Sequence, residues 1–185
     1  VPIGYTRKAR ERYDLPNLVH SPEFLTARTA VHDAANPIRM VIGYPGPNPL
    51  TRAESLVDLY RSKWPHRKVV NGRIILNGKD NGMSGAGMYE GMEWGCPIHE
   101  MSSDESEAVK LFQNAFSAVK IAALNELRCI ADAAELDWER VLSALLAGGW
   151  INPMHTQVPG PDGQRGFGGS CFPKDLKNLI QCSIE

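Results

Sequence analysis

The sequence predicts an α/β segment with a parallel sheet, followed by an all-α region built on one long helix. Strand-like apolar runs alternate with helical patterns over the first 64 residues, as they do in parallel α/β proteins. Residues 103–134 then repeat apolar side chains at three- and four-residue steps and contain no Gly or Pro. The chain has 185 residues, of which 43% are hydrophobic and 22% charged, so it can bury a globular core.

Turn and capping signals predict the elements of the α/β segment. Residues 1–5 are expected to end a strand at a turn containing Gly4, and Thr6 can cap a short basic helix that runs through Arg12. The stretches that follow predict a buried strand at 17–20, the clearest strand at 38–43 and a helix at 50–64. Thr51 is a suitable cap for that last helix.

A hairpin and an irregular stretch are predicted next. Residues 68–76 contain Asn71-Gly72 between apolar residues, which is a strong hairpin signal. Residues 78–95 hold six Gly and three Met, a composition that indicates an irregular loop. Such a loop is a lid or a partner contact, or else an inserted surface loop, and the second interpretation is favoured.

The long helix is expected to begin with a capping box formed by Asp104 and Glu107. It would extend roughly 45 Å at 1.5 Å per residue. Its own domain cannot cover such a helix on every side, so we expect a second copy of the chain or further chain to do so. Two shorter helices are expected, at 138–146 behind Asp137 and at 174–184 after Pro173.

Composition argues against several classes of function. A net charge of −1 removes the usual electrostatic case for nucleic acid or acidic lipid as a partner. No apolar stretch approaches the roughly 20 residues that a membrane span needs. The five His residues show no metal-ligand spacing, so no metal site is predicted. The four Cys, at positions 96, 129, 171 and 182, form no CxxC pair, which favours a reducing cytoplasm.

Residues 166–175 (GFGGSCFPKD) are the most informative segment for chemistry. Their glycines let the backbone approach a ligand closely, with N–H groups that can face phosphate or sugar oxygens. Cys171 precedes a helix start, and the helix dipole together with Lys174 favours its thiolate form. Cys171 is therefore a candidate covalent nucleophile, although a buried structural Cys beside a tight turn is the alternative.

Three further residues are candidates of weaker standing. Lys110 and Asn114 share a face of the long helix, where they could donate a proton or stabilise an oxyanion. Spacing alone favours an ordinary solvated helix face for this pair. Glu23, which lies between Pro22 and Phe24, could be a general base held in a rigid turn, but most carboxylates are simply solvated.

Three ordered motifs, spread over about residues 1–180, resemble the UDP-glucose/GDP-mannose dehydrogenase family. The first is SPEFL at 21–25, followed by His32-Asp33 and by NPIRMVIG at 36–43. The second lies on the long helix, with Glu107, Lys110, the triplet NAF at 114–116 and NEL at 125–127. The third is GFGGSCFPKD, which resembles the catalytic-cysteine motif of the family.

The resemblance implies an NAD-dependent, two-step oxidation of a nucleotide sugar from the C6 alcohol to the carboxylate. Cys171 would form a thiohemiacetal and then a thioester. Lys110, Asn114 and Asp175 would handle the proton and the oxyanion, while Glu23 would serve the hydrolytic water. The nucleotide sugar is expected at Glu23, Phe24, Leu25, Lys110, Asn114 and the backbone of Gly166, Phe167, Gly168 and Gly169. The nicotinamide is expected at Cys171, Phe172, Pro173 and Lys174.

The resemblance also implies a division of the chain. Residues 1–68 would be the C-terminal part of an NAD-binding Rossmann-like domain, and residues 69–101 an inserted hairpin, loop and linker. Residues 102–185 would form the helical dimerisation domain, with a homodimer through the helix at 104–134. Two positions depart from the family pattern: Ala27 stands where a second Glu is usual, and Trp150 stands where a substrate-binding Arg is common.

The sequence contains no G-x-G-x-x-G after a predicted strand, which is the motif that binds the phosphates of NAD. We expect the chain to be a segment of a larger enzyme that alone neither binds NAD measurably nor turns over substrate. The form of the cysteine motif favours UDP-glucose as the substrate of that enzyme, and GDP-mannose is the alternative. A dimerising or partner-binding module without catalysis is the competing hypothesis.

Overall fold

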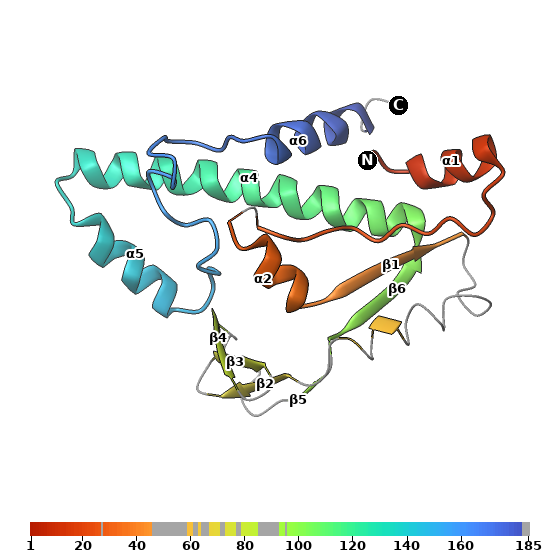
Figure 1. The fold of residues 1–185 in the computed structure, drawn as a ribbon. Coiled ribbons are helices and arrows are strands. Elements are labelled where there is room, and N and C mark those ends of the chain that lie inside the picture. Colours follow the sequence, from red (N-terminus) through yellow and green to blue (C-terminus); the bar gives the residue numbers. More distant parts are fainter. Residues whose placement is uncertain are drawn as a thin grey trace. The chain divides into compact units, whose positions relative to one another are not determined.

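The structure is a computed structural model that describes residues 1–26, 28–45, 59–60, 63, 67–70, 73–76, 79–84, 93–94 and 96–182 (Figure 1). The chain divides into two compact units. The first unit comprises Val1 and Ile3–Lys110, and the second comprises Pro2 and Leu111–Glu185. One long helix, α4 (Ser103–Ala133), belongs in part to each.

A parallel pair of strands forms the centre of the first unit. Strand β1 (Met40–Tyr44) pairs with β6 (Ile98–Ser102), and the two lie side by side in Figure 1. Residues 41–44 of β1 are all buried, as is usual for strands of parallel sheets. The predicted fold class, parallel strands followed by a long helix, is therefore confirmed. The strand at 98–102 was not predicted, because its partner lies more than fifty residues earlier in the chain.

The N-terminal elements differ in part from the prediction. Helix α1 (Tyr5–Tyr13) is present, but its N-cap is Gly4, with φ of 83°, and Thr6 lies inside the helix. No strand occurs at residues 1–5, and the strand expected at 17–20 reduces to a single bridge between His20 and Gly43. Prolines on both sides limit how far a ladder can extend there. A short helix, α2 (Ala30–Ala35), follows.

The predicted hairpin is confirmed by two antiparallel strands. Strand β2 (Arg67–Val70) pairs with β3 (Arg73–Leu76), and the turn between them lies outside the described residues. Strands β4 (Lys79–Ser84) and β5 (Glu93–Trp94) extend this sheet in the order β4-β3-β2-β5. The prediction of an irregular loop over 78–95 is therefore wrong at these two strands. The helix predicted at 50–64 lies mostly outside the described residues, although residues 59, 60 and 63 are helical.

Helix α4 has the predicted extent but a different cap. The Ser102 hydroxyl accepts the Glu105 N–H at 3.2 Å, and the Glu105 carboxylate accepts the Ser102 N–H at 2.7 Å. This reciprocal pair is a capping box. The predicted box of Asp104 and Glu107 is wrong, because the helix begins at Ser103, two residues earlier than that pattern requires.

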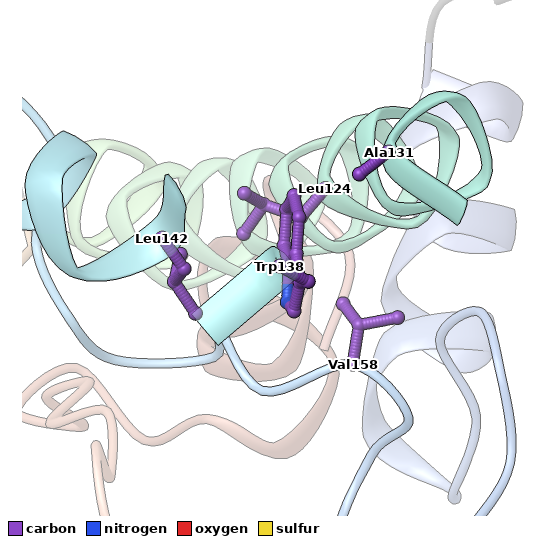
Figure 2. Close-up of a cluster of buried hydrophobic side chains, with 5 residues drawn as sticks. All are labelled: Leu124, Ala131, Trp138, Leu142 and Val158. Carbon is purple, nitrogen blue, oxygen red and sulfur yellow. The ribbon is translucent and has the colours of Figure 1, made fainter. Parts of the chain in front are cut away.

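The second unit packs a helix and a loop against α4. Helix α5 (Trp138–Ala147) has the predicted N-cap, since Asp137 accepts the N–H groups of the second and third helical residues. Figure 2 shows the buried cluster formed by Leu124, Ala131, Trp138, Leu142 and Val158. The last helix, α6 (Cys171–Cys182), begins three residues earlier than predicted.

Candidate active site

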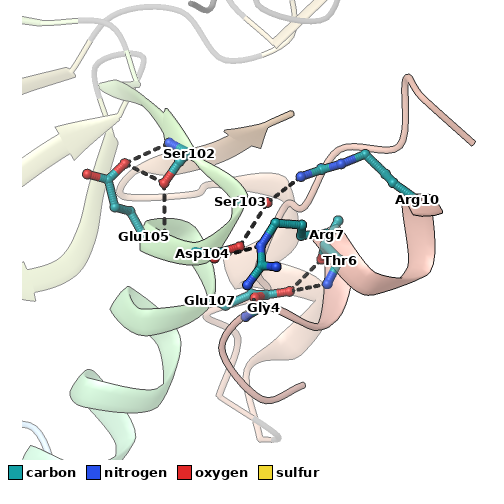
Figure 3. A network of polar contacts seen from close by, with 9 residues as sticks. All are labelled: Gly4, Thr6, Arg7, Arg10, Ser102, Ser103, Asp104, Glu105 and Glu107. Carbon is teal, nitrogen blue, oxygen red and sulfur yellow. Dashed lines mark hydrogen bonds and ion pairs between the residues drawn. The ribbon is translucent and has the colours of Figure 1, made fainter. Parts of the chain in front are cut away.

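A buried carboxylate ties the start of α4 to the start of α1. The Glu107 side chain is 0% exposed and accepts the N–H groups of Gly4 at 2.6 Å and Thr6 at 2.7 Å. The Thr6 hydroxyl donates to the same carboxylate at 2.5 Å, and Figure 3 shows these contacts. The first N–H groups of a helix lack partners within the helix, so Glu107 caps α1 from a distant segment.

One turn later on α4, Lys110 contacts the first motif segment. Its ammonium group donates to the backbone carbonyl of Glu23 and lies 3.8 Å from the Glu23 carboxylate. It also lies 5.4 Å from the centre of the Phe24 ring, and the Arg39 guanidinium lies 4.3 Å from that centre. The Glu23 carboxylate in turn accepts the Leu25 N–H. These contacts arrange Glu23, Phe24 and Leu25 around the Lys110 ammonium, within the first unit.

In the second unit, Asp175 is the centre of a buried polar cluster. Its side chain is 2% exposed, accepts a hydrogen bond from the Asn114 amide at 2.5 Å and forms an ion pair with Lys174. Burial alone would raise the pKa of Asp175, but the hydrogen bonds from Lys174 and Asn114 outweigh it and hold the pKa below that of an ordinary carboxyl. Asp175 is therefore ionised at neutral pH, with its charge directed at two donors.

Cys171 is the first residue of α6, four positions before Asp175. Its thiol is exposed, and the Ser170 hydroxyl lies 3.8 Å from the sulfur. The alternative of a buried structural cysteine is therefore excluded. Pro173 is accommodated in the first turn, because the N–H groups of that turn need no partner within the helix. The thiol consequently lies at the positive end of the helix dipole.

The glycines before Cys171 have open space around them. Gly166 and Gly169 have φ of 83° and 72°, which favours glycine at both positions. Gly168 has no such φ, and a Cβ there would meet nothing within 4 Å. Side chains therefore do not crowd this backbone, and the space beside it is available to a ligand. Phe167 is 38% exposed in the same segment.

The predicted site residues thus form two groups. Glu23, Phe24, Leu25 and Lys110 are in contact within the first unit. Within the second unit, Asp175 contacts both Asn114 of α4 and Lys174, its neighbour on the helix that begins at Cys171. Asn114 is 6% exposed, whereas a quarter of the Lys110 side chain is exposed, so the solvated helix face that spacing alone favoured is wrong for Asn114.

Several contacts of the cysteine segment were not predicted. Arg165 donates to Asp132 at 2.6 Å, and Asn125 accepts the Gly166 N–H at 2.9 Å. The ring of His155 meets the Phe172 ring edge to face, with centres 5.4 Å apart. Burial, and secondarily the charge of Lys120, lowers the pKa of His155. Gly166 and Phe172 belong to the predicted cysteine motif, and of their partners only Asn125 carried a signal, because it lies in the NEL motif at 125–127.

Two further findings apply to the described ranges only. Within them, no group of three or more His, Cys, Asp or Glu side chains is arranged to hold a metal ion. Among the same residues, no helix combines the length and apolar character needed to cross a membrane.

Comparison with known proteins identifies relatives of both units. Residues 104–185 match the central domain of the UDP-glucose/GDP-mannose dehydrogenase family. The UDP-glucose 6-dehydrogenase of Campylobacter jejuni is 27% identical over 97% of this chain, and that of Streptococcus pneumoniae is 26% identical over 97%. The chain spans 37% and 38% of the length of these curated relatives.

A solved structure agrees with these sequence relatives. The UDP-glucose dehydrogenase of the hyperthermophilic archaeon Pyrobaculum islandicum superposes with a TM-score of 0.69 at 28% identity. The match covers 100% of this chain and 35% of that protein. The strand pair, the long helix and the cysteine segment therefore occur together in a fold already known from dehydrogenases.

Proposed function

We propose that this chain, whose residues 104–185 match the central domain of the UDP-glucose/GDP-mannose dehydrogenase family, is the cysteine-bearing part of an NAD-dependent nucleotide-sugar dehydrogenase. The reaction is the oxidation of the C6 alcohol of UDP-glucose to the carboxylate of UDP-glucuronate. The observation that carries this proposal is the exposed Cys171 thiol at the start of α6, four residues before a buried and ionised Asp175.

The second unit supplies the nucleophile and its support. The Cys171 sulfur, at the first residue of α6, attacks the C6 carbonyl carbon of the aldehyde. Asp175 holds the Asn114 amide and the Lys174 ammonium in place. These two donors are then oriented in advance for the oxygen that becomes negative as the carbon turns tetrahedral.

The first unit supplies the groups for the proton and the water. The Lys110 ammonium group lies 3.8 Å from the Glu23 carboxylate, and it can donate a proton to the sugar oxygen or stabilise the charge of that oxygen. Glu23 is the carboxylate that would orient the water for hydrolysis of the Cys171 thioester. Phe24, Leu25 and the backbone of residues 166–169 would bind the nucleotide sugar, because the first segment presents an aromatic ring and the glycines of the second have open space beside them.

The described residues fit only one end of NAD. Phe172 and Pro173 are half-buried beside the exposed Cys171, so they offer a surface for the nicotinamide together with Lys174. A phosphate-binding G-x-G-x-x-G after a strand is not found in the sequence. Bound NAD would supply hydride acceptance. We therefore expect the 185-residue chain alone to show no NAD binding by calorimetry and no NADH formation.

The test is an assay of the longest in-frame product of the gene with UDP-glucose or GDP-mannose and NAD. We expect NADH formation with UDP-glucose, at two NADH per sugar oxidised, and a loss of about 10³-fold or more in kcat for Cys171→Ser. Cys182→Ser, at the other end of α6, is the matched control and should retain activity. Turnover of GDP-mannose alone would reassign the substrate, and no turnover of either sugar would favour the non-catalytic module.

We further propose that a second copy of the chain covers the apolar face of α4. Five side chains on this helix are large, hydrophobic and 44–71% exposed: Phe112, Phe116, Val119, Leu127 and Ile130. They lie four, three, eight and three residues apart, close to whole turns of a helix, and so form one exposed apolar stripe. Such a stripe on a helix of 31 residues can pair with its own copy in an isologous contact.

Light scattering at micromolar concentration tests this dimer. The wild-type chain should have the mass of two copies, and Phe116→Glu should have the mass of one. Val31→Glu, at an exposed apolar position of α2, is the matched control and should remain dimeric. A wild-type monomer would contradict the proposal.

We also propose a location in the cytoplasm. All four cysteines, which lie in the described ranges, are free thiols, in keeping with a reducing compartment.

A further inference from the structure

Polar side chains of α4 hold the segment that leads to Cys171. Lys120 donates to the carbonyls of Asn152 and Met154, and Arg128 donates to the carbonyl of Val158 at 3.3 Å. Further along the segment, Arg165 and Gly166 are bound by side chains of the same helix. The path of residues 150–170 is therefore set by α4.

Asn125 is the buried member of this set. Asn125 is 8% exposed, and both the nitrogen and the oxygen of its side-chain amide form hydrogen bonds. The nitrogen donates to the Ile121 carbonyl at 2.8 Å, and the oxygen accepts the Gly166 N–H at 2.9 Å. The first contact fixes the amide on the helix, and the second fixes the backbone of the segment.

The neighbouring contact, between Arg165 and Asp132, is more exposed to solvent. Arg165 reaches Asp132 at 2.6 Å and the Cys129 sulfur at 2.9 Å, but its side chain is 48% exposed and that of Asp132 is 39% exposed. Exposed ion pairs contribute little because solvent screens them. Beyond Gly166, positions 168 and 169 have nothing within 4 Å of a Cβ. Among the described residues, the partly buried hydrogen bond from Gly166 to Asn125 is the last contact from a side chain of α4 to the segment before Cys171.

We propose that Asn125 is a positioning residue for Cys171, acting through the Gly166 N–H. Gly166 has φ of 83°, and a backbone held in that conformation by one hydrogen bond fixes the direction in which the next five residues run. Loss of the acceptor leaves a partly buried N–H unpaired and frees residues 166–170. The catalytic part of this inference rests on the proposed dehydrogenase activity.

Three variants separate this role from general stability. Asn125→Leu removes the acceptor at nearly the same size, Asn125→Asp keeps an oxygen toward Gly166, and Arg165→Ala removes the exposed ion pair. Hydrogen exchange on the full 185-residue chain measures how well the backbone amides of the segment are protected. We expect amides of residues 165–170 to exchange at least about tenfold faster in Asn125→Leu, and within about threefold of wild type in the other two.

The longest in-frame product provides the kinetic readout. Asn125→Leu should lower kcat by about 10- to 100-fold with KM within about threefold, because the thiol is misplaced while the sugar still binds. Asn125→Asp should restore most of kcat. Faster exchange with unchanged kcat, unchanged exchange in Asn125→Leu, or an equal effect of Arg165→Ala would each overturn the proposal.

The two proposals fail in distinguishable ways. If the wild-type product oxidises no nucleotide sugar, the dehydrogenase assignment is wrong, and the exchange experiment still decides whether Asn125 anchors the segment. Site-resolved alkylation then replaces kcat as the readout. Asn125→Leu should change the iodoacetamide rate of Cys171 more than threefold while that of Cys182 stays constant, and equal rates at Cys171 would overturn the positioning role.

Discussion

The two ends of α4 are held in different ways. Its first turns carry a fully buried carboxylate, Glu107, which three donors of another segment satisfy. Its later turns carry an apolar cluster centred on Trp138, with polar contacts to the cysteine segment beside it. The comparison teaches that the first end is specified by a few polar contacts that cannot be replaced by water, whereas the second is specified by shape and buried area.

The largest effect should come from removing the buried carboxylate. Glu107→Ala leaves three donors without an acceptor, and each unpaired group costs about 1–3 kcal/mol, so we expect a loss of about 4 kcal/mol in the free energy of unfolding. Urea unfolding followed by circular dichroism measures it, and exchange of the α1 amides should accelerate. Glu107→Gln is the control with a smaller loss. A loss in Glu107→Ala below about 1 kcal/mol would remove the contrast between the two ends.

The apolar end should respond to a cavity. Leu142 is 8% exposed in the Trp138 cluster, whereas Leu145, one turn on in α5, is 39% exposed. We expect Leu142→Ala to lose about 3 kcal/mol and Leu145→Ala less than about 1 kcal/mol. Urea unfolding followed by tryptophan fluorescence measures both. Equal losses would show that the cluster does not hold this end of the helix.

A close approach of two backbones adds a further contrast. A Cβ on Gly43 would lie 2.6 Å from the Ser106 Cβ and 2.7 Å from the Ser103 Cα. Gly43→Ala forces β1 and the start of α4 apart, and we expect a loss of about 2 kcal/mol in thermal unfolding. Gly148→Ala, in the other unit, meets its nearest atom at an ordinary 3.4 Å and should cause no loss. An unchanged melting temperature for Gly43→Ala would contradict the close packing.

The smallest effect should be a dependence on pH at Asp175. Hydrogen bonds hold its pKa below the ordinary value in the folded chain, so the folded state binds fewer protons than the unfolded one at acidic pH. The stabilisation is complete above the ordinary carboxyl pKa and is lost as pH falls through the lowered one. Exchange of the α6 amides between pH 6 and pH 3, corrected for intrinsic rates, should show this loss. In Asp175→Asn, the corrected exchange rates should change less over that pH range. Equal pH dependence in the wild type and the variant would show that Asp175 is not the group responsible.

Local signals predicted a large part of the fold. The extent of α4, the Asp137 cap of α5 and the β2–β3 hairpin all depend on residues a few positions apart, and all three are confirmed. The errors occurred where two local patterns competed. Ser102 and Glu105 form the capping box of α4, whereas the prediction chose the Asp104 and Glu107 pattern two residues later.

The candidate site was identified in part for the same reason. Cys171, Lys174 and Asp175 are neighbours in sequence, so their proximity was visible in the motif. The contact between Asn114 and Asp175 joins residues 61 positions apart, and the Gly166 contact of Asn125 joins residues 41 apart. Spacing alone therefore ranked Asn114 as solvated, and it assigned no role to Asn125.

By itself, the sequence determined where the long helix lies, that Cys171 stands beside a helix start and which family the chain resembles, because hydrophobic period, glycine placement and motif order act over short distances. Only the tertiary structure decided which polar groups are buried and what they bind. Glu107 was expected to cap its own helix and instead caps α1, about a hundred residues earlier. A buried carboxylate must find its donors wherever the fold brings them, and that depends on the packing of whole segments.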